Sequence, residues 1–232
     1  MQLDWSILLG PSGVLLLQGA RVTLQLAALA LTLALILGFL FGVLRWSGFP
    51  PLKLVCWLYV EFCRNTPPLV QILFWYFSAT VILPPGAILF LRDYGFEFAA
   101  AIFALGIYHS AFIAEIVRAG LNAIPRGQYE AAQAIGLSFP TTMCSILFPQ
   151  LLRIIAPMLI SEAVSLTKNT SLALAIGVTE ITYEARTIDY VSFHGVEALT
   201  AITGFYLVLC VSIAGLGHLL QRFLSRHRRA PA

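Results

Sequence analysis

The sequence predicts an all-α integral membrane protein with about five transmembrane helices. Its composition is the first reason: 59% of the 232 residues are hydrophobic, 11% are charged, and the mean hydropathy is +0.86. A chain with so few polar residues cannot cover the surface of a soluble globule. The second reason is that its charges lie mostly between apolar stretches, each long enough to cross or nearly cross a bilayer.

The first span is defined by two arginines. No charged side chain lies between Arg21 and Arg45, and a helix over residues 22–44 would be roughly 34 Å long, enough to cross the hydrocarbon core. We expect residues 1–18 to form a periplasmic or interfacial segment. Residues 19–221 would then form one membrane domain, and residues 222–232 a basic cytoplasmic tail.

Four further spans follow from the same pattern. The second runs from about residue 54 to about residue 83 and contains Pro67 and Pro68, which interrupt a helix. The third covers about residues 98–117. The fourth runs from about residue 151 to about residue 178, and the fifth lies between Glu197 and Arg222. An odd number of spans places the two termini on opposite sides of the membrane.

The distribution of basic residues predicts the orientation. They flank the first loop, the third loop and the tail: Arg45, Lys53, Arg118, Arg126, Arg153, Arg222, Arg226, Arg228 and Arg229. Residues 180–197 form an acidic loop by contrast. The positive-inside rule therefore places the third loop and the C-terminus in the cytoplasm and the N-terminus outside.

Several classes of function are disfavoured. The net charge of +3 comes from scattered basic residues and indicates no nucleic-acid partner. The four cysteines form no CxxC pair, and His109, His194 and His218 lack ligand spacing, so we expect no metal site. No Ser/His/Asp or HExxH arrangement suggests catalysis within the membrane. No GxxxxGK[ST] pattern occurs, so we expect no cofactor bound by this chain and any ATP hydrolysis by a partner.

The long polar segment at residues 128–149 is predicted to be a rigid knob. Residues 128–135 form a short Ala-rich helix that Gly136 ends. Ser138 is expected to cap a second short helix, and Pro149 to close the unit before the fourth span begins.

The knob also carries a spacing with a known counterpart: Glu130, Ala131, Ala132, Gly136, Ile146 and Pro149. This spacing resembles the EAA loop of the membrane subunits of bacterial binding-protein-dependent ABC importers. Phe148 departs from the family pattern, which usually has Leu there, and a large apolar side chain is kept. The alternative is an ordinary connector between two helices.

The resemblance implies a fold and a set of partners. The fold would be a type I ABC importer transmembrane domain in the bacterial inner membrane, surrounded by lipid. Its EAA loop would dock in a groove of an ATPase that binds ATP and Mg²⁺. A periplasmic amino acid-binding protein would deliver the substrate, and a second permease subunit, identical or different, would complete the pathway.

Three further segments, at residues 59–77, 111–137 and 167–181, resemble the polar amino acid branch of that family. The runs RNTPPLVQ, LTKNTS and TIDYVSFH are most similar to glutamate/aspartate permease subunits. The resemblance implies ATP-driven import of such an amino acid by alternating access. The alternative is a self-sufficient secondary transporter or channel, a class that often has inverted repeats; none is detectable in this sequence.

Charged pairs mark two helix ends. Glu61 and Arg64 stand three residues apart, as do Glu115 and Arg118. The two members of each pair therefore share a helix face, and their opposite charges can neutralise each other. Glu61 and Arg64 are candidates for the substrate pathway. The alternative for both pairs is an interfacial ion pair that anchors a helix end.

Further pathway candidates surround the two prolines of the second span. Asn65, Thr66 and Gln71 lie where Pro67 disfavours helical geometry and frees backbone groups. The alternative is a structural kink packed against a neighbouring helix.

The last candidates lie in the fourth span: Lys168, Asn169, Thr170 and Ser171. Glu162 and Lys168 are six positions apart, so they do not face each other and each needs a separate partner or water. Cavity-facing positions would reduce the cost of charge at this depth. An interface with a second permease subunit is the competing interpretation.

Overall fold

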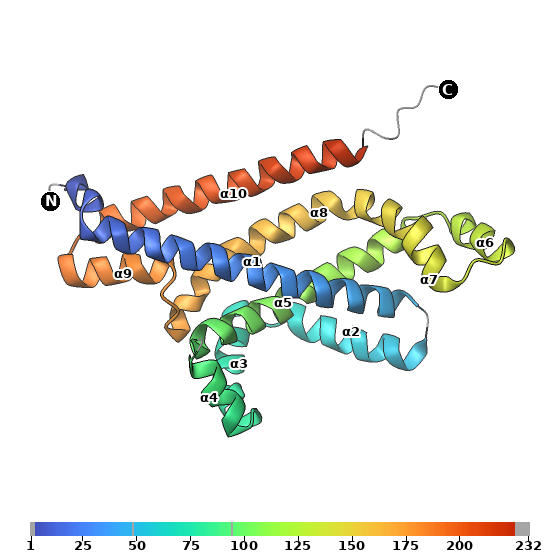
Figure 1. Ribbon diagram of the computed structural model, residues 1–232, viewed down its shortest axis with the longest axis horizontal. Helices are drawn as coiled ribbons and strands as arrows, with labels where there is room; N and C mark the ends of the chain where they lie inside the picture. The colour runs from blue at the N-terminus through green and yellow to red at the C-terminus, as the bar shows by residue number, and fades with distance from the viewer. Residues whose placement is uncertain (1–2, 48, 94, 226–232) are drawn as a thin grey trace.

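The computed structural model describes residues 3–47, 49–93 and 95–225, which are almost entirely helical (Figure 1). The elements are η1 Trp5–Leu9, α1 Pro11–Trp46, α2 Pro50–Arg64, α3 Pro68–Ile82, α4 Pro85–Asp93, α5 Phe96–Asn122, α6 Arg126–Ala134, α7 Phe139–Thr142, the π-helical turn η2 Met143–Leu147, α8 Phe148–Asn169, the 3-10 segment η3 Thr170–Ile176, α9 Ile181–Ser192 and α10 Gly195–Ser225.

Four of the described helical stretches are long and apolar enough to cross a membrane. They are Pro11–Trp46, Phe96–Asn122, Phe139–Ile176 and Gly195–Arg222. The shorter apolar helix α3 stands within the expected second span. The prediction of an all-α membrane fold is confirmed.

Helix α1 begins earlier than the expected first span. It starts at Pro11, which suits the first helical turn because that position needs no amide hydrogen. Much of the segment at residues 1–18 is therefore the first two turns of α1 or the preceding turn η1, whose cap Asp4 accepts a hydrogen bond from the Ser6 amide.

Helices α1 and α5 form the centre of the fold. A Cβ atom added at Gly38 would lie 2.5 Å from Ile113 Cβ, and one at Gly42 would lie 2.7 Å from Val117 Cβ. These two glycines, one turn apart, let the backbones approach closely, which stabilises helix pairs in lipid through packing contacts. The stripe continues along α1 through buried side chains: Leu26, Ala30 and Ala34.

The expected second span is two helices, because the chain breaks between α2 and α3. Pro67 has no amide hydrogen to donate to the Cys63 carbonyl one turn earlier. The side chain of Gln71 replaces that donor: its Nε2 lies 2.9 Å from the Cys63 oxygen, and the residue is only 2% exposed. The break at the prolines was predicted, whereas this internal seal was not.

The acidic loop expected at residues 180–197 contains a helix, α9. Its cap Glu180 is fully buried and accepts hydrogen bonds from the amides of Thr182 and Tyr183, each at 2.9 Å. Helix α9 and the turn η1 both lie at one end of the molecule, and α6 and α7 lie at the other (Figure 1).

The sidedness of the protein stays a prediction. Helices α1 and α10 both start at the end that carries α9 and run toward the end that carries α6 (Figure 1). Arg222 lies in the last turn of α10, whereas the tail residues Arg226, Arg228 and Arg229 lie outside the described residues.

Candidate coupling loop and translocation pathway

Helix α6 ends at Ala134, two residues before Gly136, where the break was predicted. The backbone there has φ +77°, a left-handed conformation that favours glycine. The Gly136 amide donates to the Gln133 carbonyl at 2.9 Å and the Leu137 amide to the Ala132 carbonyl at 3.0 Å. These two bonds are a Schellman motif, which satisfies the last carbonyls of α6 and fixes the direction in which the chain leaves.

The second half of the knob differs from the prediction at Pro149. Ser138 does occupy the cap position of α7, but its hydroxyl pairs with the Thr141 hydroxyl at 2.9 Å. The chain then continues through the π-helical turn η2 directly into α8, so Pro149 does not separate the knob from the fourth span. Proline is accommodated because it falls in the first turn of α8, where the wider turn η2 precedes it.

The knob is attached to the body of the protein by aromatic and apolar contacts. The Tyr129 ring of α6 packs edge-on against the Trp46 ring at the end of α1, with centroids 5.9 Å apart. Ala132 is 1% exposed, and Ile146 packs against the main hydrophobic core. These contacts connect the knob to the end of α1 and to the main hydrophobic core.

The remaining face of the knob is free. Glu130, Ala131 and Gly136 are exposed, and two large apolar side chains project from it, Ile135 at 75% exposure and Phe139 at 43%. Exposed apolar groups at the end of a polar knob are typical of a surface that docks on a partner.

A second polar site lies between α5 and α8. His109 Nδ1 lies 2.5 Å from Glu162 Oε1, and His109 Nε2 lies 3.2 Å from Asn169 Nδ2. Because the amide nitrogen only donates, the ring accepts at Nε2 and donates its Nδ1 hydrogen to the carboxylate. Glu162 thus has the separate partner that we expected for it.

His109 was not predicted as a site residue. It is 1% exposed and lies in the middle of a spanning helix. One feature of the sequence could have indicated His109: ionisable residues inside a membrane usually pair, so Glu162 in one span needed a polar partner in another. Spacing alone could not select Glu162, which is 53 positions away.

The candidates after Glu162 occupy the junction of α8 and η3. Lys168 is exposed, and no acidic side chain of the described residues pairs with it. Thr170 is buried and donates to the Thr167 carbonyl at 2.7 Å, while the Ser171 hydroxyl donates to the Lys168 carbonyl at 2.8 Å. Lys168, Asn169, Thr170 and Ser171 therefore follow the buried cluster along one continuous segment.

The expected ion pair between Glu61 and Arg64 is not formed. The Glu61 carboxylate instead accepts a hydrogen bond from the side-chain Nδ2 of Asn65 at 2.9 Å. The Arg64 guanidinium lies over the Phe112 ring of α5, 5.6 Å from its centroid. A cation near an aromatic face is stabilised without a carboxylate, and helix spacing could not reveal this contact with a distant residue.

The polar side chains at the proline break are engaged locally. Thr66 donates to the Phe62 carbonyl at 2.9 Å, and Gln71 Nε2 lies 2.5 Å from the Thr66 hydroxyl. These bonds are those of a sealed kink, the alternative interpretation of this segment. A substrate contact at Asn65, Thr66 or Gln71 stays a prediction.

The second predicted ion pair is confirmed and extended. The Glu115 carboxylate pairs with Arg118 on the same helix and also with Arg45 at the end of α1, the latter at 2.5 Å. This three-residue network joins α1 to α5 next to the knob.

Comparison with known proteins identifies the family. Residues 30–226 match the family described as "Binding-protein-dependent transport system inner membrane component". The chain belongs to this family. Its members are transport components in the inner membrane, and they are not ATPases themselves.

Individual relatives of this inner membrane component are amino acid permeases. The chain is 30% identical to the arginine transport system permease protein ArtQ of Bacillus subtilis, covering 97% of this chain and 98% of that one. It is 34% identical to the glutamate/aspartate import permease protein GltJ of Escherichia coli K12, covering 88% and 85%. A solved structure titled "Crystal structure of an amino acid ABC transporter with histidines" matches with a TM-score of 0.81 at 30% identity, covering 96% and 99%. The chain is thus a multi-pass permease of an amino acid ABC importer with the type I fold.

Proposed function

We propose that this permease imports glutamate and aspartate by alternating access, driven by a separate ATPase that docks on the EAA loop. A periplasmic binding protein would deliver the amino acid, a second permease subunit would complete the pathway, and ATP and Mg²⁺ would bind to the ATPase. The observation that carries the coupling is the rigid attachment of α6 to the ends of the spanning helices.

The attachment supports coupling because force needs a stiff connection. The Schellman motif at Gly136 fixes one end of α6, and the Tyr129–Trp46 contact holds its side. The ATPase can shift the membrane helices only if its two states make different contacts with them. The exposed Ile135 and Phe139 provide apolar area for such contacts.

The coupling is tested at Gly136, where charge and backbone strain can be separated. A side chain at this position meets open space, so only conformation and charge matter. We expect Gly136→Asp to reduce ATP-driven uptake in proteoliposomes at least tenfold while the membrane level of the protein is unchanged. Gly136→Asn, which tolerates the left-handed conformation without charge, should keep most of the uptake. Equal uptake by the Asp variant and the unmodified protein would contradict docking at this loop.

The choice of glutamate and aspartate is supported by GltJ and by the exposed Lys168, whose ammonium group complements a second carboxylate on the substrate. A specific observation favours a second candidate, a cationic amino acid such as arginine. The Glu162 carboxylate, partly exposed beside His109, complements a guanidinium group, and ArtQ is a relative of similar identity.

Two substitutions separate these substrates. Lys168→Ala should lower the uptake of glutamate and aspartate and leave the level of assembled complex unchanged, whereas Glu162→Gln should spare that uptake, because Gln still accepts from His109. The reverse pattern, with arginine uptake lost in Glu162→Gln, would establish the second candidate. The affinity of the purified binding protein for glutamate, aspartate, glutamine and arginine provides an independent measurement.

A further inference from the structure

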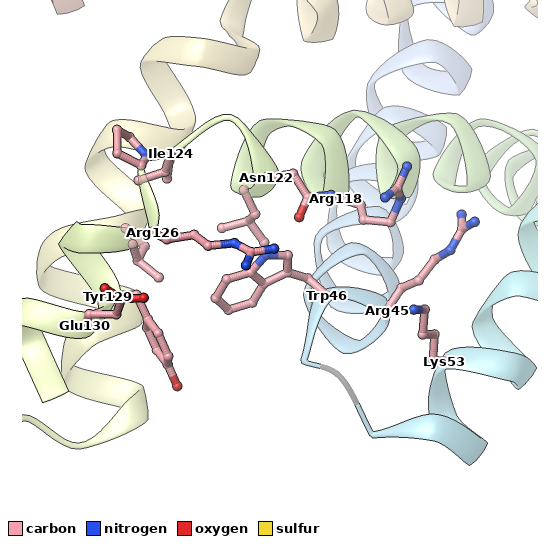
Figure 2. Close-up of a pocket in the computed structure, with 12 residues that line it drawn as sticks. Arg45, Trp46, Lys53, Arg118, Asn122, Ile124, Arg126, Tyr129 and Glu130 are labelled. Carbon is pink, nitrogen blue, oxygen red and sulfur yellow. The ribbon is translucent and has the colours of Figure 1, made fainter.

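A basic pocket lies between the knob and the ends of three other helices. Its volume is about 610 Å³, within the range of pockets that hold small organic ligands. Figure 2 shows its cationic side chains distributed around Trp46. Its basic and aromatic lining residues are Arg45, Trp46, Lys53, Arg118, Arg126 and Tyr129.

The positive charge of this pocket is only partly compensated. Glu115 pairs with Arg45 and Arg118, but no ion pair joins Lys53 or Arg126 to an acidic side chain of the described residues. Glu130 is the acidic residue in the lining. Two cations from different helices, α2 and α6, therefore face a shared cavity without a fixed counter-charge.

The depth of the pocket along the spanning helices favours a lipid headgroup. Arg45 is the first charged residue after the uncharged run of α1, and Arg118 follows the apolar part of α5. These positions mark the level at which the hydrocarbon core ends and lipid phosphates begin. Trp46 and Tyr129 suit the same level, because amphipathic aromatic rings concentrate at the interface.

We propose that this pocket binds a phosphate group, that of an anionic phospholipid headgroup. Basic pockets between the ends of membrane helices recognise such headgroups through charge and hydrogen bonds. Lys53 and Arg126 bind the phosphate, and Arg45 and Arg118 are held at the rim by Glu115. The volume exceeds that of a bare phosphate ion and accommodates the rest of a headgroup.

A lipid in this position contacts both the body and the knob. Lys53 lies on α2 and Arg126 on α6. A phosphate bound to both side chains would connect the body to the knob, as the Tyr129–Trp46 contact already does. An acidic segment of the ATPase is the rival occupant. The location at the depth of the lipid phosphates favours the lipid.

Native mass spectrometry of the assembled importer tests the proposal. The complex, with its ATPase, is released from vesicles that contain equal amounts of phosphatidylglycerol and phosphatidylcholine, at 150 mM NaCl. We expect one retained phosphatidylglycerol per permease chain, and a loss of at least fivefold in retention for the variant Lys53→Gln/Arg126→Gln. The matched control Arg186→Gln/Arg222→Gln removes the same charge from exposed positions outside the pocket and should retain the lipid.

The outcomes are distinct. Equal retention of the two lipids, or equal losses in the two double variants, would overturn the proposal. Retention only after the ATPase is removed would assign the pocket to the protein partner and would also overturn it. Retention of added inorganic phosphate that depends on Lys53 and Arg126, together with no retained phosphatidylglycerol from the mixed vesicles, would keep the phosphate site and reject the lipid as its source.

Discussion

At the scale of single residues, the protein places its most costly polar groups in contact with one another across helices. His109, Glu162 and Asn169 form a chain of hydrogen bonds between α5 and α8. Toward the other end of the molecule, Glu180 accepts from two backbone amides and from the Tyr206 hydroxyl, the last at 3.1 Å. Both clusters satisfy a carboxylate that apolar surroundings would otherwise destabilise.

The first residue-scale prediction concerns His109. His109→Leu removes the partner of Glu162 and should lower the stability of the purified complex by about 2–3 kcal/mol, because an unpaired charged group is left within a span. Glu162→Gln keeps an acceptor for His109 and should cost clearly less. The measurement is thermal unfolding in detergent, followed by tryptophan fluorescence. Equal losses in the two variants would show that pairing is not the source of the effect.

The second residue-scale prediction concerns pH. Burial raises the pKa of Glu180, although its hydrogen bonds to Thr182, Tyr183 and Tyr206 act in the opposite direction. A raised carboxyl pKa stabilises the folded state fully below the ordinary pKa of 4.5, and that stability is lost as pH rises through the folded-state value.

The direction of this pH dependence can be measured by comparing the unmodified protein with a Glu180→Gln variant. As pH rises above 4.5, the unmodified protein should lose stability relative to Glu180→Gln, whose side chain cannot ionise. The difference in melting temperature between the two should therefore move in favour of the Gln variant as pH rises. Parallel melting curves across this range would remove Glu180 as a titrating group.

At the scale of elements, the contact between α1 and α5 depends on missing side chains. A methyl group at Gly42 would overlap Val117 and lie 2.8 Å from the Ala114 carbonyl oxygen. The Ala114 backbone cannot move aside as easily as a flexible side chain can. Gly42→Ala should therefore destabilise the protein by about 1–3 kcal/mol. Gly215→Ala in α10 is the matched control, since a Cβ there meets open space, and its melting temperature should not fall. A neutral Gly42→Ala would contradict the close approach.

The elements differ in how far the sequence predicts them. The uncharged run before Arg45, the break at Pro67 and the helix before Gly136 were predicted, because each depends on local charge or backbone chemistry. Helices α4 and α9 and the continuous path through Pro149 were not predicted, since the packing of neighbouring segments decides them. The contact of Arg64 with Phe112 and the pairing of His109 with Glu162 join distant residues, and no spacing rule reveals such contacts.

At the scale of the whole molecule, the proposed coupling depends on the separation of two ends. The knob of α6 and α7 lies at one end and η1 with α9 at the other, and the long helices connect them (Figure 1). The buried cluster of His109, Glu162 and Asn169 lies on two of those helices. This arrangement suits a permease in which contacts at the knob change access to a site elsewhere along the helices.

An external ATPase that drives transport through the knob makes uptake depend strictly on ATP. The most direct test of this dependence is uptake of radiolabelled glutamate into proteoliposomes that contain the permease, its ATPase and its binding protein, with the nucleotide enclosed on the ATPase side. We predict accumulation with ATP and none with ADP, in the presence or absence of an ion gradient. Accumulation that an ion gradient supports without ATP would identify a self-sufficient transporter and contradict the account.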